Sequence, residues 1–169
     1  MNLSSVWHFW SLTARFRAEG VMKIKGPWTN DQARFFLDES TIPLRIACQG
    51  ASGYPLIASL WYLREGETLW CATQRGSGLA ARLSKDGKCA FEVSVEAPPY
   101  RGVRGSALAT LHPNRGEEVL RGLIRRYHGS TGSTFARLLL DKVESEVAIA
   151  LHARNLTSWD FNKRMKTEA

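Results

Sequence analysis

Short connections between strand-like segments constrain the fold of this chain more than any other feature. In residues 42–48, apolar and polar side chains alternate with a period of two, which is typical of a strand with one buried face. Further strands are expected at 55–63, 69–73, 89–96, 101–111 and 147–151. Parallel strands need crossovers of about a dozen residues, and most of these connections are shorter. The sequence therefore predicts a mainly antiparallel sheet.

Local signals place helices around these strands. Thr29 and Gln32 have the spacing of a capping box, which predicts a helix over 30–39. We expect a second helix of about two turns to begin near Ser77, directly after a glycine-rich turn. This arrangement favours an antiparallel barrel with peripheral helices, so the expected fold class is mainly β with added α structure.

The second half of the chain is expected to contain two further helices. Asn114 is the expected N-cap of a helix whose apolar stripe ends near Gly129, a residue suited to a C-terminal cap. A shorter helix is expected over 134–140, with three side chains turned inward: Phe135, Leu138 and Leu139. The last strand carries Ala148 and Ala150 on one face, which predicts that another element packs closely there.

The composition is that of one globular domain. A length of 169 residues is typical of a single domain, and 44% hydrophobic residues can form a core. No segment approaches the roughly 20 apolar residues that cross a bilayer, so we expect no membrane partner. Arg15 and Arg17 follow a short aromatic patch, whereas a secretory signal places its basic residues first. We therefore treat residues 1–21 as an N-terminal extension, 22–169 as the domain and the cytoplasm as the expected location.

Lysine and arginine, 23 in all, outnumber the 16 acidic residues, giving a formal charge of +7. Such a surplus suits either an anionic partner or an ordinary soluble surface. The densest basic group, Arg121, Arg125 and Arg126, shares its predicted helix with Glu117 and Glu118. No predicted strand interleaves aromatic and basic side chains as single-strand binding platforms do. We therefore expect no nucleic-acid partner.

The sequence offers no catalytic group by motif. Cys48, Cys71 and Cys89 each fall in a predicted strand without a Cys-x-x-Cys pair, which favours buried free thiols in a reducing compartment. The histidines are scattered, so no metal site is expected. Neither a catalytic triad, nor a nucleophile elbow, nor a paired-carboxylate site can be identified.

The glycine-rich turn at 75–78 is the most informative segment. Its backbone N–H groups, the hydroxyls of Thr73 and Ser77 and the guanidinium of Arg75 together resemble a cradle for a phosphate group. The alternative is an ordinary capped turn with a solvated Arg75. Gly76-x-Gly78-x-x-Ala81 also matches a dinucleotide-binding fingerprint, but that motif requires parallel strands on either side, which the short connections argue against.

Three segments carry a family resemblance: PLIASLWYL, then LWCATQRGSGLAARLSKDGKCAFEV, then YRGVRGSALATL. Their order resembles the pyridoxamine 5′-phosphate oxidase-like, FMN-binding split-barrel family, and the closing IALHARNLTSWDFNKRM is similar to the tail of its small bacterial members. The resemblance covers about residues 28–165. It implies a six-stranded antiparallel Greek-key split barrel that forms a homodimer, with FMN in a groove at the subunit interface.

The resemblance also implies which residues contact the cofactor. Three would run along the flavin ring: Ser59, Leu60 and Trp61. Four would hold the phosphate: Ala72, Thr73, Arg75 and Ser77. Leu79 stands where the family usually has a basic residue, and Arg82, one turn further on, is the candidate replacement.

Three residues near the C-terminal end complete the expected site. Arg101 and Arg104 resemble a basic pair that faces the flavin of the partner subunit, although solvated surface arginines would give the same pattern. Trp159 is expected to cover either the flavin or the dimer seam, the alternative being a plain packing anchor.

The function implied is that of an FMN-dependent oxidoreductase of unknown substrate. His152-Ala-Arg154 reverses the Arg-x-His motif with which true pyridoxamine phosphate oxidases bind substrate, so a different substrate is expected. A flavin carries the redox chemistry itself, which fits the lack of a recognisable acid–base pair. The alternatives are a non-catalytic flavin carrier or sensor, and a related barrel that binds haem or a deazaflavin.

Overall fold

The computed structural model describes residues 24–165, so the predicted extension at 1–21 lies outside the described residues. The strands are β1 (Ile24–Lys25), β2 (Leu44–Gln49), β3 (Pro55–Leu60), β4 (Leu63–Glu65), β5 (Thr68–Gln74), β6 (Lys88–Ser94), β7 (Arg101–His112), β8 (Glu146–Ala153) and β9 (Leu156–Asp160). The helices are α1 (Asn30–Glu39), α2 (Gly78–Lys85), α3 (Gly116–His128), α4 (Thr134–Leu140) and α5 (Asn162–Met165).

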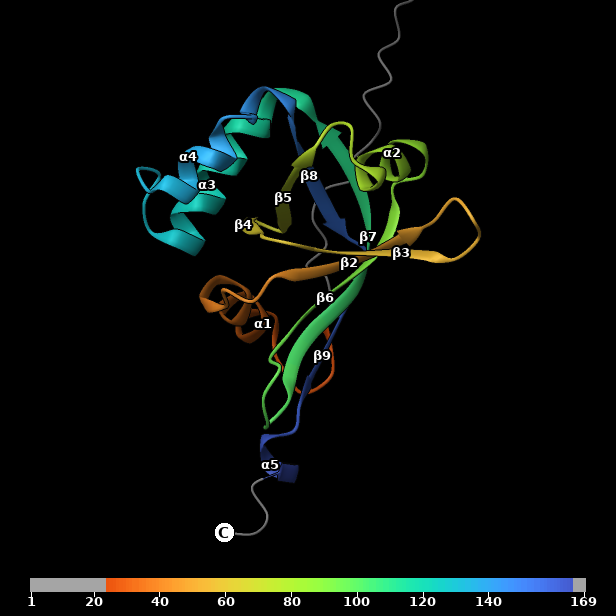
Figure 1. Ribbon diagram of the computed structural model, residues 1–169. Helices are drawn as coiled ribbons and strands as arrows, with labels where there is room; N and C mark the ends of the chain where they lie inside the picture. The colour runs from red at the N-terminus through yellow and green to blue at the C-terminus, as the bar shows by residue number, and fades with distance from the viewer. Residues whose placement is uncertain (1–23, 166–169) are drawn as a thin grey trace, which may run out of the picture.

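These strands form one strongly curled sheet in the order β3-β2-β6-β7-β8-β5-β4, with β9 paired to β7 and β1 (Figure 1). The pairs in the described chain are antiparallel, except the short β1–β9 pair, so the predicted sheet type is confirmed. The sheet has nine strands rather than the six expected. β5 and β6 flank the Gly76-x-Gly78 fingerprint but are not neighbours in the sheet, which excludes dinucleotide binding of the Rossmann type.

The strand expected over 55–63 is interrupted after Leu60. The reason is Tyr62, whose side chain is fully buried and whose hydroxyl donates to the carbonyl of Leu37 at 2.7 Å. This contact with the end of α1 draws the chain away from β2, and the chain then continues as β4. Gly66, with φ at 58°, turns β4 back into β5 and confirms the predicted hairpin.

The core fills the concave side of the sheet and is closed by α1 and α2. Its central side chains include Leu44, Ile46, Phe91, Val103 and Ile149. All three cysteines are buried and free, as predicted. None of the helices in the described part of the chain has the length and apolarity that a membrane crossing requires.

A second layer lies on the outer face of β5 and β8, where α3 and α4 lie side by side (Figure 1). Val119 and Leu123 of α3 pack against Ala148 and Ala150, which confirms the predicted close packing. Gly116, at the start of α3, lies so near β8 that an added Cβ would stand 2.3 Å from the carbonyl oxygen of Glu146. These contacts fix the position of α3 and α4 over one end of the sheet.

Two details of this layer differ from the prediction. Asn114 lies within a single 3₁₀ turn, and the N-cap of α3 is Arg115, which makes no side-chain capping bond. In α4, Phe135 and Leu138 are 45% and 64% exposed, because Ala136 is the residue that faces α3. The expected helix at 134–140 and the left-handed C-cap at Gly129 are both confirmed.

Candidate functional site

The curled sheet is split between β3 and β5. β3 pairs with β2 only, and β4 covers β5 only as far as Trp70. The remaining residues of β5, 71–74, have β8 on one side and no strand on the other. Strand edges of this kind present backbone N–H and C=O groups that are free to bind another molecule.

A groove of about 360 Å³ lies at this split. Its walls come from the end of β3, the end of β5, the covering helices α3 and α4, and the start of β8. The lining residues are Ser59, Leu60, Trp61, Ala72, Thr73, Gln74, Leu120, Leu123, Phe135, Leu139 and Glu146. Five predicted cofactor contacts, from β3, the residue directly after it and β5, are thus brought together. The residues from the helices and β8 were not foreseen.

Trp61 forms an aromatic wall of the groove. Its ring stacks on Tyr127 at 4.9 Å between centroids with 11° between planes, and Phe135 meets it edge-on at 6.3 Å. Tyr127 is held in place because its hydroxyl accepts a hydrogen bond from the backbone N–H of Tyr62 at 3.3 Å. Burial raises the pKa of Tyr127, so this support stays uncharged. A fixed flat wall of this kind suits a planar aromatic ligand.

The turn after β5 is preorganised at the edge of the groove. The Thr73 hydroxyl donates to Ser77 Oγ at 3.1 Å, and Ser77 Oγ caps α2 by accepting from the N–H of Ala80 at 3.1 Å. Nothing lies within 4 Å of the place where a Cβ would stand at Gly76 or Gly78. The backbone here leaves room for a phosphate group to approach closely.

Arg75 contributes to this turn in two ways. Its backbone N–H donates to the carbonyl of Ser145 at 2.7 Å, which ties the turn to the segment before β8. Its side chain is exposed and makes no ion pair within residues 24–165, so it is free to meet an anion.

Two residues of α2, Leu79 and Arg82, are candidates for the phosphate site, and neither contributes a basic side chain to the groove. Leu79 is 6% exposed and belongs to the core, so the expected basic residue has been replaced by a packing residue. Arg82 does not line the groove. Its helix packs against β2. Burial raises the pKa of the Cys48 thiol on β2, and the charge of Arg82 opposes this rise.

The remaining predicted residues lie elsewhere on this chain. The Arg104 guanidinium stands over the Trp159 ring, 5.5 Å from its centroid, across the β7–β9 pair. Arg101 borders a cavity beside α1, together with Trp28 and Asp160. None of the three lines the groove.

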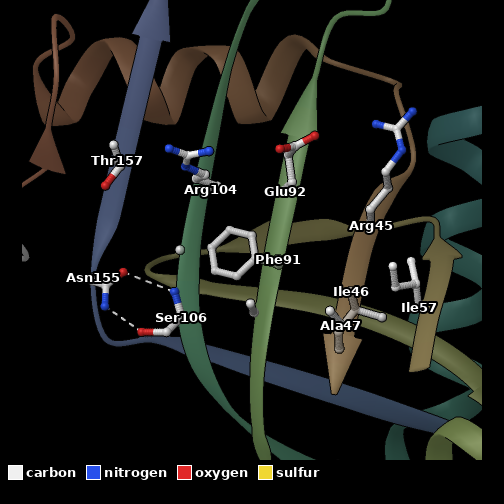
Figure 2. Close-up of a pocket in the computed structure, with 12 residues that line it drawn as sticks. Arg45, Ile46, Ala47, Ile57, Phe91, Glu92, Arg104, Ser106, Asn155 and Thr157 are labelled. Atoms are coloured by element: carbon white, nitrogen blue, oxygen red, sulfur yellow. Dashed lines mark hydrogen bonds between the residues drawn. The ribbon is translucent and has the colours of Figure 1, made fainter. Parts of the chain in front are cut away.

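Arg104 also borders a second pocket, of about 490 Å³, on the outer face of the sheet (Figure 2). Strand pairing places Arg45, Glu92 and Arg104 in one row, with Thr157 beyond them on β9. The next row consists of small residues: Ala47, Ala90 and Ser106. Asn155 fixes the side of the pocket by accepting from the N–H of Ser106 at 3.1 Å.

The pocket and the groove are neighbours. Ile57 and Ser59 lie on one face of β3, and Trp61 directly follows the strand. Ile57 lines the pocket, whereas Ser59 and Trp61 line the groove. Arg45 pairs directly with Ser59, so its side chain stands beside the boundary between the two hollows. An ion pair of 2.5 Å with Glu96 holds it there. Its place opposite Ser59 became visible only through the strand register.

Comparison with known proteins identifies the fold. No family model and no curated protein sequence matches this chain. A conserved hypothetical protein from Mycobacterium tuberculosis has a similar structure, with a TM-score of 0.71 at 22% identity over 85% of this chain and 91% of that one. An F420 reductase matches with a TM-score of 0.60 at 19% identity, over 71% and 92% of the two chains.

Two further solved structures have a similar fold. A relative of general stress protein 26 from Clostridium acetobutylicum, of the pyridoxinephosphate oxidase family, has a TM-score of 0.58 at 16% identity, over 77% and 87% of the chains. A haem storage protein from Vibrio cholerae reaches 0.57 at 15%, over 75% and 92%. This chain therefore has the split-barrel fold of the pyridoxamine 5′-phosphate oxidase-like proteins.

Proposed function

We propose that this chain binds a flavin cofactor, FMN, in the groove between β3 and β5. The observation that carries the proposal is the split itself: two unpaired strand edges and the Trp61 wall meet in one groove. Exposed backbone groups suit the polar edge of a flavin ring, and the aromatic wall suits its apolar face. The open turn at Gly76 and Gly78, with Arg75 beside it, suits the phosphate.

The lining favours a flavin over haem. Haem iron in proteins is bound by histidine, cysteine, methionine or tyrosine, and none of the groove-lining residues is of these types. A deazaflavin shares the ring shape of a flavin, and an F420 reductase is among the similar structures. The buried Leu79 removes one expected phosphate contact, which makes the deazaflavin the second candidate.

We further propose that the bound cofactor serves an oxidoreductase. The flavin would supply the hydride or electron transfer, while the protein orients the ring and limits access of water. Trp61 fixes the plane of the ring, and Leu120, Leu123 and Leu139 cover the groove with apolar surface. A carrier or sensor would need the same binding groove, so turnover separates the two functions.

A homodimer would complete this site. The groove, at about 360 Å³, lies near the lower end of the range for small-ligand pockets, about 300–1,000 Å³. Arg104 and Trp159 stand outside it, so we propose that they reach the cofactor of a partner subunit across the face shown in Figure 2. Arg101 borders the separate cavity beside α1 and is not part of this proposed contact. The free thiols suit a reducing compartment, and the cytoplasm is the proposed location.

The first test is the visible spectrum of the purified protein and identification of any cofactor released by heat. A yellow protein that releases FMN is expected. A Soret band, or a colourless protein whose titration leaves FMN fluorescence unchanged, would overturn the proposal. In the flavin-loaded protein, reduction by NADH or NADPH with multiple turnovers would indicate an enzyme, and reduction without turnover a carrier.

A paired substitution tests the turn. Arg75→Ala with Ser77→Ala removes a charged contact and the hydroxyl that organises the turn, so FMN affinity should fall about ten-fold or more. Riboflavin, which lacks the phosphate, should lose much less. Arg125→Ala, an exposed arginine on α3, is the control and should leave both affinities unchanged. Equal FMN binding by the double variant and the native chain would place the phosphate elsewhere.

A further inference from the structure

The groove contains one charged side chain, that of Glu146, the first residue of β8. Glu146 shares its strand face with Ala148 and Ala150, which pack against α3, and it therefore points toward the covering helices. Gln74 stands directly opposite on β5 and lines the same groove. A carboxylate and an amide thus lie side by side where most of the lining is apolar.

Glu146 combines partial burial with a lack of partners, whereas the other unpartnered acids in the described residues are exposed. Within residues 24–165, no hydrogen bond or ion pair reaches its carboxylate, whereas Asp38 and Glu118 are each paired with an arginine. Burial raises the pKa of Glu146, and no neighbouring charge contributes to the shift. An acid removed from water without a donor is unfavourable, and such a group is a frequent sign of a missing ligand contact.

We propose that Glu146 accepts a hydrogen bond from a ring N–H of the ligand, and that Gln74 donates to the carbonyl beside it. The pair would then recognise an imide edge, in which an N–H is flanked by carbonyl groups. This inference rests on the proposed flavin function, since the pyrimidinedione ring of flavins and deazaflavins carries such an edge. Haem carries none, so the pair also discriminates between cofactor classes.

Lumiflavin and 3-methyllumiflavin provide the test, because they differ only in whether the imide nitrogen carries a hydrogen or a methyl group. Neither has a phosphate, so contacts at the turn do not affect the comparison. The native chain should bind lumiflavin about ten-fold or more tightly than the methylated compound, as expected for a hydrogen bond to a charged group. Glu146→Leu should bind lumiflavin more weakly and lose the preference. Glu144→Gln, an exposed acid two residues earlier, is the control and should keep it.

The outcomes separate this inference from the function on which it rests. If the native chain binds lumiflavin but Glu146→Leu keeps the same preference, the methyl group is excluded by shape and the role of Glu146 is wrong, while flavin binding stands. If the native chain binds neither lumiflavin nor FMN, both proposals fail. Circular dichroism of Glu146→Leu checks its fold, and Glu146→Gln provides a second variant with nearly the same shape.

Discussion

Arg126 is a partly buried charge that the fold, unlike the groove acid Glu146, supplies with partners. Its guanidinium donates to the carbonyls of Leu37 at 2.7 Å and Ser40 at 2.6 Å and lies over the ring of Tyr62 at 5.1 Å. These carbonyls belong to the last turn of α1 and to its C-cap, which need such donors. Arg126 therefore joins α3 to the end of α1.

Removing this charge should destabilise the protein. Arg126→Met keeps an apolar stem but removes the two hydrogen bonds donated by a charged group, leaving the Tyr62 hydroxyl as the donor at these carbonyls. The free energy of unfolding should therefore fall by about 1.5–3 kcal/mol. Urea denaturation measures the change. Arg125→Met, at an exposed neighbouring position, should stay within about 0.5 kcal/mol of the native chain. Equal losses in both variants would mean that helix propensity, not the bonds to α1, explains the result.

Replacing the unpaired acid Glu146 should have the opposite effect from replacing Arg126: it should stabilise the protein, by an amount that depends on pH. Burial raises the pKa of Glu146 in the folded state, so folding favours its protonated form, and this stabilisation is lost as the pH rises through the raised pKa. Glu146→Gln should therefore be more stable than the native chain at pH 7, whereas below pH 4.5, its ordinary pKa, the difference should vanish. Thermal unfolding of both ligand-free proteins across this range measures it. A difference that is constant with pH would contradict the unpaired state of the carboxylate.

The contact between α3 and β8 determines the shape of the groove. Gly116→Ala would place a Cβ 2.3 Å from the carbonyl oxygen of Glu146, so α3 must move away from the strand. Alanine usually favours a helix over glycine, yet here we expect a loss of about 1–3 kcal/mol in unfolding free energy and weaker flavin binding. Gly132→Ala, whose Cβ would meet nothing closer than 3.5 Å, is the control. Higher stability of Gly116→Ala would show that α3 is not held by this contact.

The elements that local chemistry specifies were predictable from the sequence. The helix at 30–39 follows from the Thr29–Gln32 capping box, whose two hydrogen bonds are both present. The interruption after Leu60 was not predictable, because it depends on the bond from Tyr62 to Leu37, 25 residues earlier. β9 was missed for a similar reason, since its pairing with β7 completes it as a strand.

The residues of the candidate site also divide into those that the sequence predicted and those that it did not. The expected cofactor contacts at the ends of β3 and β5 came from the family resemblance. That resemblance rests on the order of strands along the chain, which the sequence itself shows. Glu146 and Gln74 were missed because only the β5–β8 register places them side by side. A sequence signal did exist: Glu146 stands two residues before Ala148, on the strand face that the alanines already predicted to be covered.

For the whole molecule, the adjacent groove and pocket suggest that one chain provides parts of two sites. In the proposed site, its own groove would supply the ring wall and the phosphate turn, while Arg104 and Trp159 stand on the sheet face between β3 and β9. The same face exposes Ile57 by 68%, a large apolar side chain bordering the pocket. Apolar surface beside a charged row is typical of a protein interface.

A charged side chain in place of Ile57 should therefore separate the subunits, and the same change should weaken cofactor binding. Light scattering should give the mass of two chains for the native protein and of one chain for Ile57→Asp, and FMN affinity should fall about ten-fold or more. Phe35→Asp, equally exposed at 68% but on α1, is the control and should leave both quantities unchanged. A monomeric Ile57→Asp with native FMN affinity would mean that one chain forms the complete site. In that case Arg104 and Trp159 would serve the surface and not the cofactor, because neither of them lines the groove of its own chain.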